Sequence, residues 1–293
     1  MIALRVLLSV VCLAISLTAL PVDSHAAAIR PGFNSTSDGR NDDGTWTAPA
    51  GCTNAANAGT CAGTAVPLGF TANFFGLTFT SAFINTNGNI TFDAPLSTFT
   101  PFGLTATSRK IIAPFFADVD TRNAASGVVT FGNGTVDGHN AFGVNWINVG
   151  YFDRHVDKLN SFQMILIDRS DIAPGDFDIE FNYDRIAWET GDASGGNGGL
   201  GGSSAHAGFS NGTGNPGTSF EFAGSGVPGS LLDGNLATGL INNSLNSDVL
   251  GRYDFFARNG EIEVPTPTPE PSAFVLIGSA LTGLALMRRR RKD

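Results

Sequence analysis

The sequence is short of residue types that several classes of protein require. Its 293 residues include only three lysines, whereas long surface helices normally need more lysine and glutamate. Only Cys52 and Cys61 lie outside the N-terminal apolar run, and two cysteines alone make a poor metal site. The sequence also lacks an HExxH motif and a Gly-Lys-Ser/Thr phosphate-binding loop. These absences argue against a helical fold, a zinc enzyme and a nucleotide-binding enzyme.

Glycine, proline and phenylalanine are abundant instead. The chain has 37 Gly, 14 Pro and 23 Phe, and 42% of its residues are hydrophobic. This composition favours β structure with many turns, and the chain is long enough to bury a full core.

Two apolar patterns predict strands with different surroundings. The run "FQMILI" (162–167) is apolar on both faces, which is typical of a central strand of a sandwich. In "FDIEFNY" (177–183) apolar residues alternate with Asp178, Glu180 and Asn182, so we predict a strand with one solvent-facing side.

A turn signal and the spacing of the strand-like runs complete the prediction. Asn87-Gly88 stands between two short apolar runs, and this dipeptide predicts a β-hairpin because both residues tolerate positive φ. No stretch has a helical period sustained over a dozen residues. We therefore predict an all-β, sandwich-like domain over residues 70–262.

The charge of the chain is acidic, with 26 Asp and Glu against 17 Lys and Arg. Between Ile29 and Pro271 there are 24 acidic and 11 basic residues, because Arg5, five basic residues of the tail, Asp23 and Asp293 fall outside. The resulting charge of about −13 argues against a nucleic-acid partner and is compatible with divalent cations or neutral glycans. Acidity that simply keeps an exported protein soluble explains the charge equally well.

The N-terminal region predicts export. Arg5 precedes an apolar run that ends in small residues, the arrangement of a cleaved signal peptide over residues 1–28. Residues 29–69 are rich in Gly, Asn, Asp and Thr, and we predict an irregular extension there. In an exported protein Cys52 and Cys61 are expected to form one local disulfide that closes a short loop.

The C-terminal end has three features in order. A Pro-rich linker over residues 263–271 ends in Pro269, Glu270 and Pro271. Residues 272–287 form an apolar run that we predict as a transmembrane helix, short for a hydrocarbon core of about 30 Å. The last feature is a basic tail over residues 288–293, which contains Arg288, Arg289, Arg290, Arg291 and Lys292 and is expected to stay cytoplasmic.

Residues 269–293 closely resemble the PEP-CTERM sorting signal, because the Pro-Glu-Pro motif, the short apolar span and the arginine cluster occur in its order. The resemblance implies an exopolysaccharide-producing Gram-negative bacterium and processing by a membrane transpeptidase-like enzyme, the exosortase. It implies a transient anchor in the inner membrane and a final place in the cell envelope, at the cell surface or in the extracellular matrix.

Motifs within the β region resemble a second family. "APFFADVD" (113–120) and "FNYDRIAW" (181–188) are the most recognisable parts of an ordered set similar to the NIDO domain of modular extracellular proteins. The resemblance implies a role in a matrix or in adhesion. It implies no established enzymatic activity and supplies no binding residues.

Asp118 and Asp120 form a candidate metal site. Side chains two residues apart point the same way from a strand end, and oxygen ligands at that spacing suit Ca²⁺. The alternative is that these carboxylates cap a turn or pair with Arg122.

A calcium ion at this place would allow a second function, a calcium-assisted module that binds glycan or exopolysaccharide. Trp46, Trp146 and Trp188 are aromatic side chains of the kind that stack on sugar rings. Trp146 and Trp188 lie in strand-like runs, however, and core positions explain them better.

A remote alternative is an acid/base glycosidase that uses Asp178 and Glu180 as its pair of carboxyl groups. Alternation places such pairs on most solvated strands. From the sequence we therefore expect a non-enzymatic, exported envelope or biofilm-matrix protein that has an exosortase and exopolysaccharide as partners. No cofactor is expected apart from the calcium considered above.

Overall fold

The computed structural model describes residues 27–46 and 63–263. The two cysteines, the Pro-Glu-Pro motif, the apolar run 272–287 and the basic tail lie outside the described residues, as do residues 1–26 of the predicted signal peptide. Within the described part, no helix is long and apolar enough to cross a membrane.

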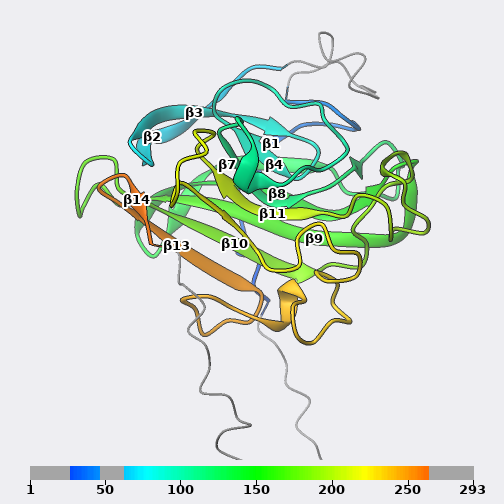
Figure 1. Cartoon of the computed structure of the whole chain (residues 1–293). Coiled ribbons are helices and arrows are strands. Elements are labelled where there is room, and N and C mark those ends of the chain that lie inside the picture. The colour runs from blue at the N-terminus through cyan, green and yellow to red at the C-terminus, as the bar shows by residue number, and fades with distance from the viewer. Residues whose placement is uncertain (1–26, 47–62, 264–293) are drawn as a thin grey trace, which may run out of the picture.

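The described chain is a sandwich of two antiparallel sheets, as the sequence predicts (Figure 1). Helical structure in these residues consists of three short 3₁₀ turns, η2 (Leu104–Ala106), η3 (Asp192–Ser194) and η4 (Leu240–Asn242). The larger sheet runs in the order β1 (Thr36–Ser37), β7 (Val129–Val136), β8 (His139–Tyr151), β9 (His155–Asp168), β10 (Phe177–Arg185), β13 (Arg252–Arg258) and β14 (Glu261–Ile262), with β6 (Val119–Asp120) also paired to β8. The smaller sheet runs in the order β12 (Ser219–Glu221), β11 (His206–Ser210), β5 (Ile111–Phe116), β4 (Asn89–Thr91), β3 (Leu77–Asn85) and β2 (Val66–Phe74).

The main core lies between the two sheets and is rich in aromatic side chains. Trp146 stacks on Phe162 with ring centroids 5.2 Å apart, and Trp188 meets Phe115 edge-on at 5.8 Å. Both tryptophans are fully buried, and their indole N–H groups donate to the backbone oxygens of Thr86 and Val149. They are core residues, so neither can stack on a sugar at the surface.

Several local predictions are confirmed. The Asn87-Gly88 dipeptide lies in the turn between the paired strands β3 and β4, where Gly88 has a φ of 71°. The run of β9 at 162–167 is apolar on both faces because Phe162, Met164 and Leu166 face the main core, whereas Ile165 and Ile167 face a second, smaller core. The first long strand, β2, starts at Val66, before residue 70, and the last strand, β14, ends at Ile262.

The predicted solvent-facing side of β10 was wrong. Asp178, Glu180 and Asn182 do share one face, but they are 7%, 2% and 0% exposed. Arginine side chains and an N-terminal segment cover them, which the alternation within the strand cannot reveal.

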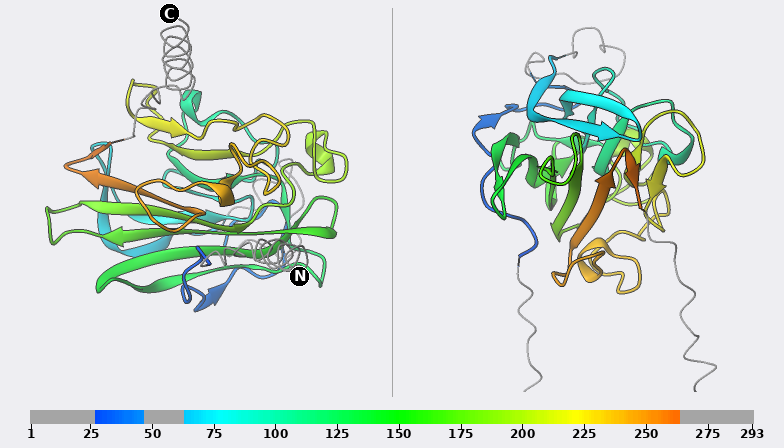
Figure 2. Two further views of the ribbon diagram at one scale, coloured as in Figure 1. Left: turned by 90° about the horizontal axis from the view of Figure 1, so that it is seen from below. Right: turned by 90° about the vertical axis from the view of Figure 1, so that its left-hand side faces the viewer.

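This segment, the N-terminal strap (residues 28–46), crosses the outer face of the larger sheet (Figure 2). The backbone N–H and oxygen of Arg30 bond to the Gln163 side chain on β9, at 3.0 and 2.9 Å. Phe33 is 5% exposed and packs in a second, smaller core with Ile165 and Ile167 of the same strand. The described part of the predicted irregular extension therefore belongs to the folded domain.

Two glycines make room for the strap. A Cβ atom at Gly143 would lie 2.4 Å from the Phe33 ring, and one at Gly134 would lie 2.8 Å from it. Real Cβ contacts are not this short, so the ring reaches the sheet only because both positions lack a side chain.

An ion pair joins the strap to β10. The Arg30 guanidinium donates to both carboxylate oxygens of Glu180, with Nε to Oε1 at 2.8 Å and a terminal nitrogen to Oε2 at 2.8 Å. Arg252 lies 3.6 Å from the same carboxylate. Glu180 is buried, so its charge depends on these two arginines.

Arg30→Ala is expected to lower the free energy of unfolding by roughly 3 kcal/mol, because it leaves a buried carboxylate with a distant partner. The urea midpoint of the purified protein measures this. Arg154→Ala is the control, since Arg154 is 52% exposed in its ion pair with Asp153 and should cost less than about 1 kcal/mol. Equal small losses in both variants would show that the Arg30 ion pair does not stabilise the fold.

Asp254→Asn is expected to stabilise the protein at pH 8 more than at pH 5. Asp254 stands opposite Glu180 in the β10 and β13 pairing, and burial, followed by this like charge, raises its pKa from 3.8 to about 7. Between these values the folded state keeps a proton that the unfolded chain releases, so stability falls as the pH rises. Melting temperatures at both pH values test this, with the exposed Asp248→Asn as control. A gain that is independent of pH would contradict it.

Candidate functional site

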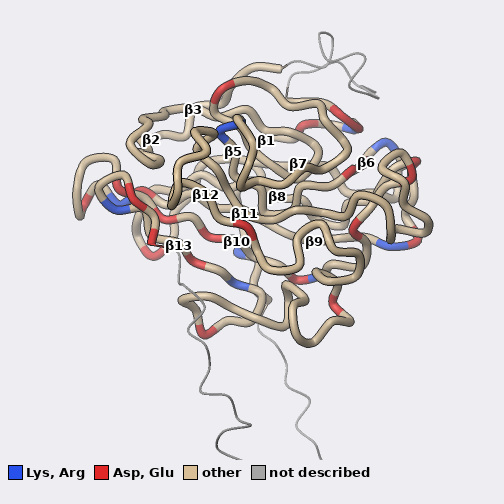
Figure 3. The backbone as a smooth tube through the Cα atoms, in the orientation of Figure 1, with Lys and Arg blue, Asp and Glu red and all other residues tan. Residues whose placement is uncertain are grey.

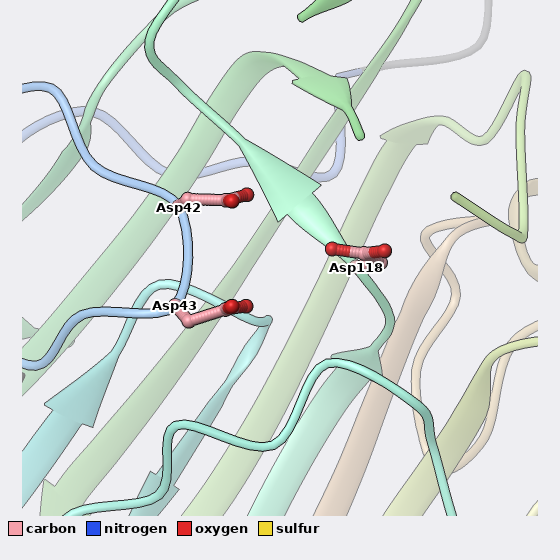
Figure 4. A group of neighbouring side chains, drawn as sticks. All are labelled: Asp42, Asp43 and Asp118. Carbon is pink, nitrogen blue, oxygen red and sulfur yellow. The ribbon is translucent and has the colours of Figure 1, made fainter. Parts of the chain in front are cut away.

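Three buried aspartates meet at one end of the sandwich. Asp42 and Asp43 lie on the strap, and their side chains project toward the segment that carries Asp118 (Figure 4). One carboxylate oxygen of each residue lies within 4.8 Å of the others. The three side chains are between 0% and 1% exposed. We call Asp42, Asp43 and Asp118 the buried acidic cluster.

The strap brings two of these residues to the cluster through contacts that precede them. The Arg40 guanidinium donates to four backbone oxygens between Thr121 and Ser126. Asn41 and Thr121 bond to each other through the Asn41 backbone N–H and oxygen, at distances of 2.7 to 2.8 Å. These contacts fix the strap beside β6 just before its two consecutive aspartates.

Asp118 reaches the cluster from the short connection between β5 and β6. Its backbone oxygen accepts a hydrogen bond from the Phe152 N–H, at 3.2 Å. A Cβ atom at Gly191 would lie 2.5 Å from its Oδ2 atom, so glycine is needed for this close approach. The carboxylate is therefore held between backbone segments of distant parts of the chain.

Among the described residues, hydrogen-bond donors reach only one of the three carboxylates. Asp43 Oδ1 accepts from the Asn87 amide at 2.9 Å. Both side-chain oxygens of Asp42 and both of Asp118 accept no hydrogen bond from any described residue. Asp42 Oδ2 does lie 3.1 Å from an Arg122 nitrogen, which makes an ion pair without hydrogen-bond geometry.

Burial and mutual repulsion make the cluster unfavourable as three free anions. Burial, with smaller effects from Asp43 and Asp120, raises the pKa of Asp42 to about 10 and that of Asp118 to about 8. Burial also raises the pKa of Asp43 to about 6, although its bond from Asn87 opposes the rise. The cluster therefore requires positive charge from protons or from a cation.

Asp120, the second predicted ligand, is not part of the cluster. Its carboxylate accepts hydrogen bonds from the backbone N–H groups of Arg122 and Arg154, at 2.9 and 2.8 Å, and pairs with the Arg122 side chain. Asp120 therefore caps a turn and pairs with Arg122, which is the alternative to metal binding stated from the sequence. Asp118 and Asp120 thus have different surroundings although they lie two residues apart.

Asp42 and Asp43 were not among the predicted site residues. Two consecutive aspartates before a glycine were a visible signal, but they stand in a segment that was predicted to be irregular. Nothing in the local pattern places that segment beside residue 118. The other acidic residues are spread over both strands and loops of the described chain (Figure 3), so composition does not single out these two.

The carboxyl pair of the glycosidase hypothesis is held in ion pairs. Asp178 lies 3.0 Å from an Arg169 nitrogen and also pairs with Arg258, while Glu180 is bound by Arg30. Both carboxylates are buried and directed at arginines. This arrangement stabilises fixed negative charge, whereas a glycosidase needs one carboxyl group that delivers a proton to an accessible sugar.

The donor set of the buried acidic cluster consists of carboxylate oxygens, which hard divalent cations prefer. Among the described residues it is the only group of three or more acidic, histidine or cysteine side chains close enough to share a metal ion. The buried acidic cluster is therefore the candidate site, and what it offers chemically is a concentration of negative charge that suits a cation.

Comparison with known proteins places this architecture in a family. The family described as "Nidogen-like domain" (NIDO) matches residues 80–137 and 131–259. Mouse alpha-tectorin is 31% identical over 219 residues, which cover 65% of this chain and 9% of the relative. Human alpha-tectorin is 30% identical over 219 residues, which likewise cover 65% of this chain and 9% of the relative.

A shorter match reaches a second relative. The nidogen of Drosophila melanogaster is 30% identical over 119 residues, which cover 32% of this chain and 9% of that protein. The chain therefore spans about a tenth of the length of the curated relatives it matches. No solved structure matches it. Because the family match extends from β3 to the end of β13, across both sheets, the chain belongs to the nidogen-like (NIDO) domain family.

Proposed function

We propose that the protein is an exported, non-enzymatic adhesion or matrix module of a bacterial cell envelope or biofilm. The observation that carries this proposal is the family match, which covers residues 80–259 and thus most of the folded domain. Its relatives are named alpha-tectorin and nidogen, and extracellular matrix proteins of this kind imply an exported chain. The buried ion pairs of Asp178 and Glu180 favour a structural role over hydrolysis.

The proposal also includes sorting through residues 269–293 as a PEP-CTERM signal that an exosortase processes. The order of Pro-Glu-Pro, apolar span and arginine cluster supports this part. The strands of the domain end at Ile262, so the Pro-rich linker begins where the β structure stops. The linker would then separate a completed domain from the segment that the enzyme handles.

Glycan binding remains a second possibility for the matrix contact, with exopolysaccharide as the ligand. The geometry does not favour the version in which a sugar binds calcium at Asp118 and Asp120. Both side chains are at most 1% exposed, so sugar hydroxyls have no access to them in this conformation. A glycan would have to use another surface.

Two variants of the full chain test sorting and adhesion separately. Deletion of residues 269–293 should move the protein from the envelope fraction to the medium, because it removes the sorting signal. Replacement of residues 66–262 by an unrelated exported domain should leave the fractionation unchanged but reduce attachment of the cells or retention in the biofilm. Immunoblots of the fractions and a surface-attachment assay measure the two effects.

The outcomes of these variants are distinct. Unchanged fractionation after the deletion would overturn sorting through the tail. Full attachment after the domain replacement would overturn the adhesion role, regardless of whether residues 269–293 act as a sorting signal.

The structure also refines the expected signal cleavage. Ala28 is 1% exposed, its N–H donates to Asp184 at 2.7 Å, and its backbone oxygen accepts from Arg252 at 2.7 Å. Cleavage after residue 28 would remove these contacts, so we expect it after Ala26, with Ser24 and Ala26 as the small residues at the third and first positions before the cut. Intact mass of the exported protein measures the position. A mature chain that starts at Ile29 would contradict this prediction.

A further inference from the structure

We propose that Asp42, Asp43 and Asp118 bind a calcium ion that holds the N-terminal strap against the β-sandwich. Each residue presents a carboxylate oxygen to the same small region, with these oxygens within 4.8 Å of one another. Asp118 is 1% exposed, and neither of its side-chain oxygens receives a hydrogen bond from a described residue. A buried carboxylate without a donor is costly, and its direction toward two further carboxylates indicates a ligand between them.

The balance of charge supports a divalent ion. The buried acidic cluster and Asp120 together place four carboxylates near one guanidinium, that of Arg122. Arg122 is bonded most closely to Asp120, which leaves the three cluster carboxylates largely uncompensated. One Ca²⁺ would neutralise two of these charges, and the ion pair between Asp42 and Arg122 would reduce the remainder.

The chemistry of the donors favours calcium over other common cations. Zinc prefers nitrogen and sulfur ligands, and no histidine or cysteine belongs to the cluster as described. Magnesium usually keeps several of its waters in a strict octahedron, which suits a buried place poorly. Calcium accepts carboxylates and backbone oxygens in irregular geometry, so three aspartates can supply the charged part of its coordination.

Residues around the cluster orient it in the way expected of a built site. The Asn87 side chain donates to Asp43 at 2.9 Å and accepts from the Val119 N–H at 2.9 Å, so it links the Asp43 carboxylate to β6. The Asn41 side-chain oxygen accepts from the Asp42 N–H at 2.9 Å, which fixes the turn that presents both strap aspartates. These contacts hold the carboxylates at the proposed ion although they repel one another.

The position of the cluster defines what the ion would do. Asp42 and Asp43 are the only members on the strap, whereas Asp118 belongs to the body of the sandwich. A shared ion therefore adds a cross-link between two parts that are otherwise joined by hydrogen bonds, the ion pair between Arg30 and Glu180, and the packing of Phe33. Calcium would thus make attachment of the strap, and with it the stability of the domain, depend on the external calcium concentration.

Calcium binding to the purified, chelator-treated protein is the first test. We expect one calcium per chain by equilibrium dialysis. At a concentration about a hundredfold above Kd, the melting temperature should rise by about 5 to 10 °C. Magnesium at the same concentration should give a much smaller rise.

Three variants assign the effect to the cluster. Asp118→Asn and Asp42→Asn should each lose the calcium-dependent rise. Both should fold in the presence of chelator, because each removes one buried negative charge from the cluster. The exposed Asp248→Asn is the matched control and should respond to calcium as the wild type does.

A local readout tests the strap itself. The Arg40 to Asn41 bond lies on the strap two residues before Asp42, and trypsin cleaves after arginine. Calcium should slow cleavage at this bond by at least tenfold in the wild type, whereas Asp118→Asn should be cut at the same rate with calcium or chelator. That variant also reports any effect of calcium on the protease.

Two results would overturn the proposal. In the first, the wild type binds no calcium and shows no shift in melting temperature, and Asp118→Asn is simply more stable, which would mean that protons neutralise the cluster. In the second, calcium binds but protects Asp118→Asn and the wild type equally, which would place the ion elsewhere.

Discussion

The burial of charge on the outer face of the larger sheet is the constraint on which the rest of the structure depends. Sandwiches usually leave outer faces to solvent, yet here Glu180 and Gln163 are covered by the strap. Once Glu180 is out of water it needs its arginines, and Arg30 can supply one of them only if the strap lies across β9 and β10. The same path carries the strap onward to Asp118, so one chain segment serves both buried charged groups.

The two buried acidic regions are balanced differently. On β10 the two buried carboxylates, Asp178 and Glu180, each have arginines within ion-pair distance, and their charge is neutralised within the protein. At the cluster the carboxylates outnumber the nearby guanidinium, and two of them lack hydrogen-bond donors among the described residues. Acidic residues that merely keep a protein soluble would lie at the surface. The acidic residues of these two buried regions therefore have structural roles that the net charge of the chain does not reveal.

Much of the fold was readable in the sequence because period-two patterns and turn residues act locally. The run at 162–167 indicated a strand buried on both faces, and Asn87-Gly88 indicated a hairpin. The cover of β10 was not readable, since Arg30 is 150 residues from Glu180 and no periodicity connects them. The partners of Asp118 were missed for the same reason, whereas Asp120 binds the nearby Arg122, a contact that spacing can suggest.

The contact between Ala28 and Arg252 has a consequence for the order of events during export. These residues are 224 positions apart, and Arg252 lies on β13, among the last strands to be synthesised. A chain that crosses a membrane from its N-terminus cannot close this contact until nearly all of the domain has passed through. In an exported chain, the attachment of the strap to β13 would therefore be one of the last contacts of the domain to form.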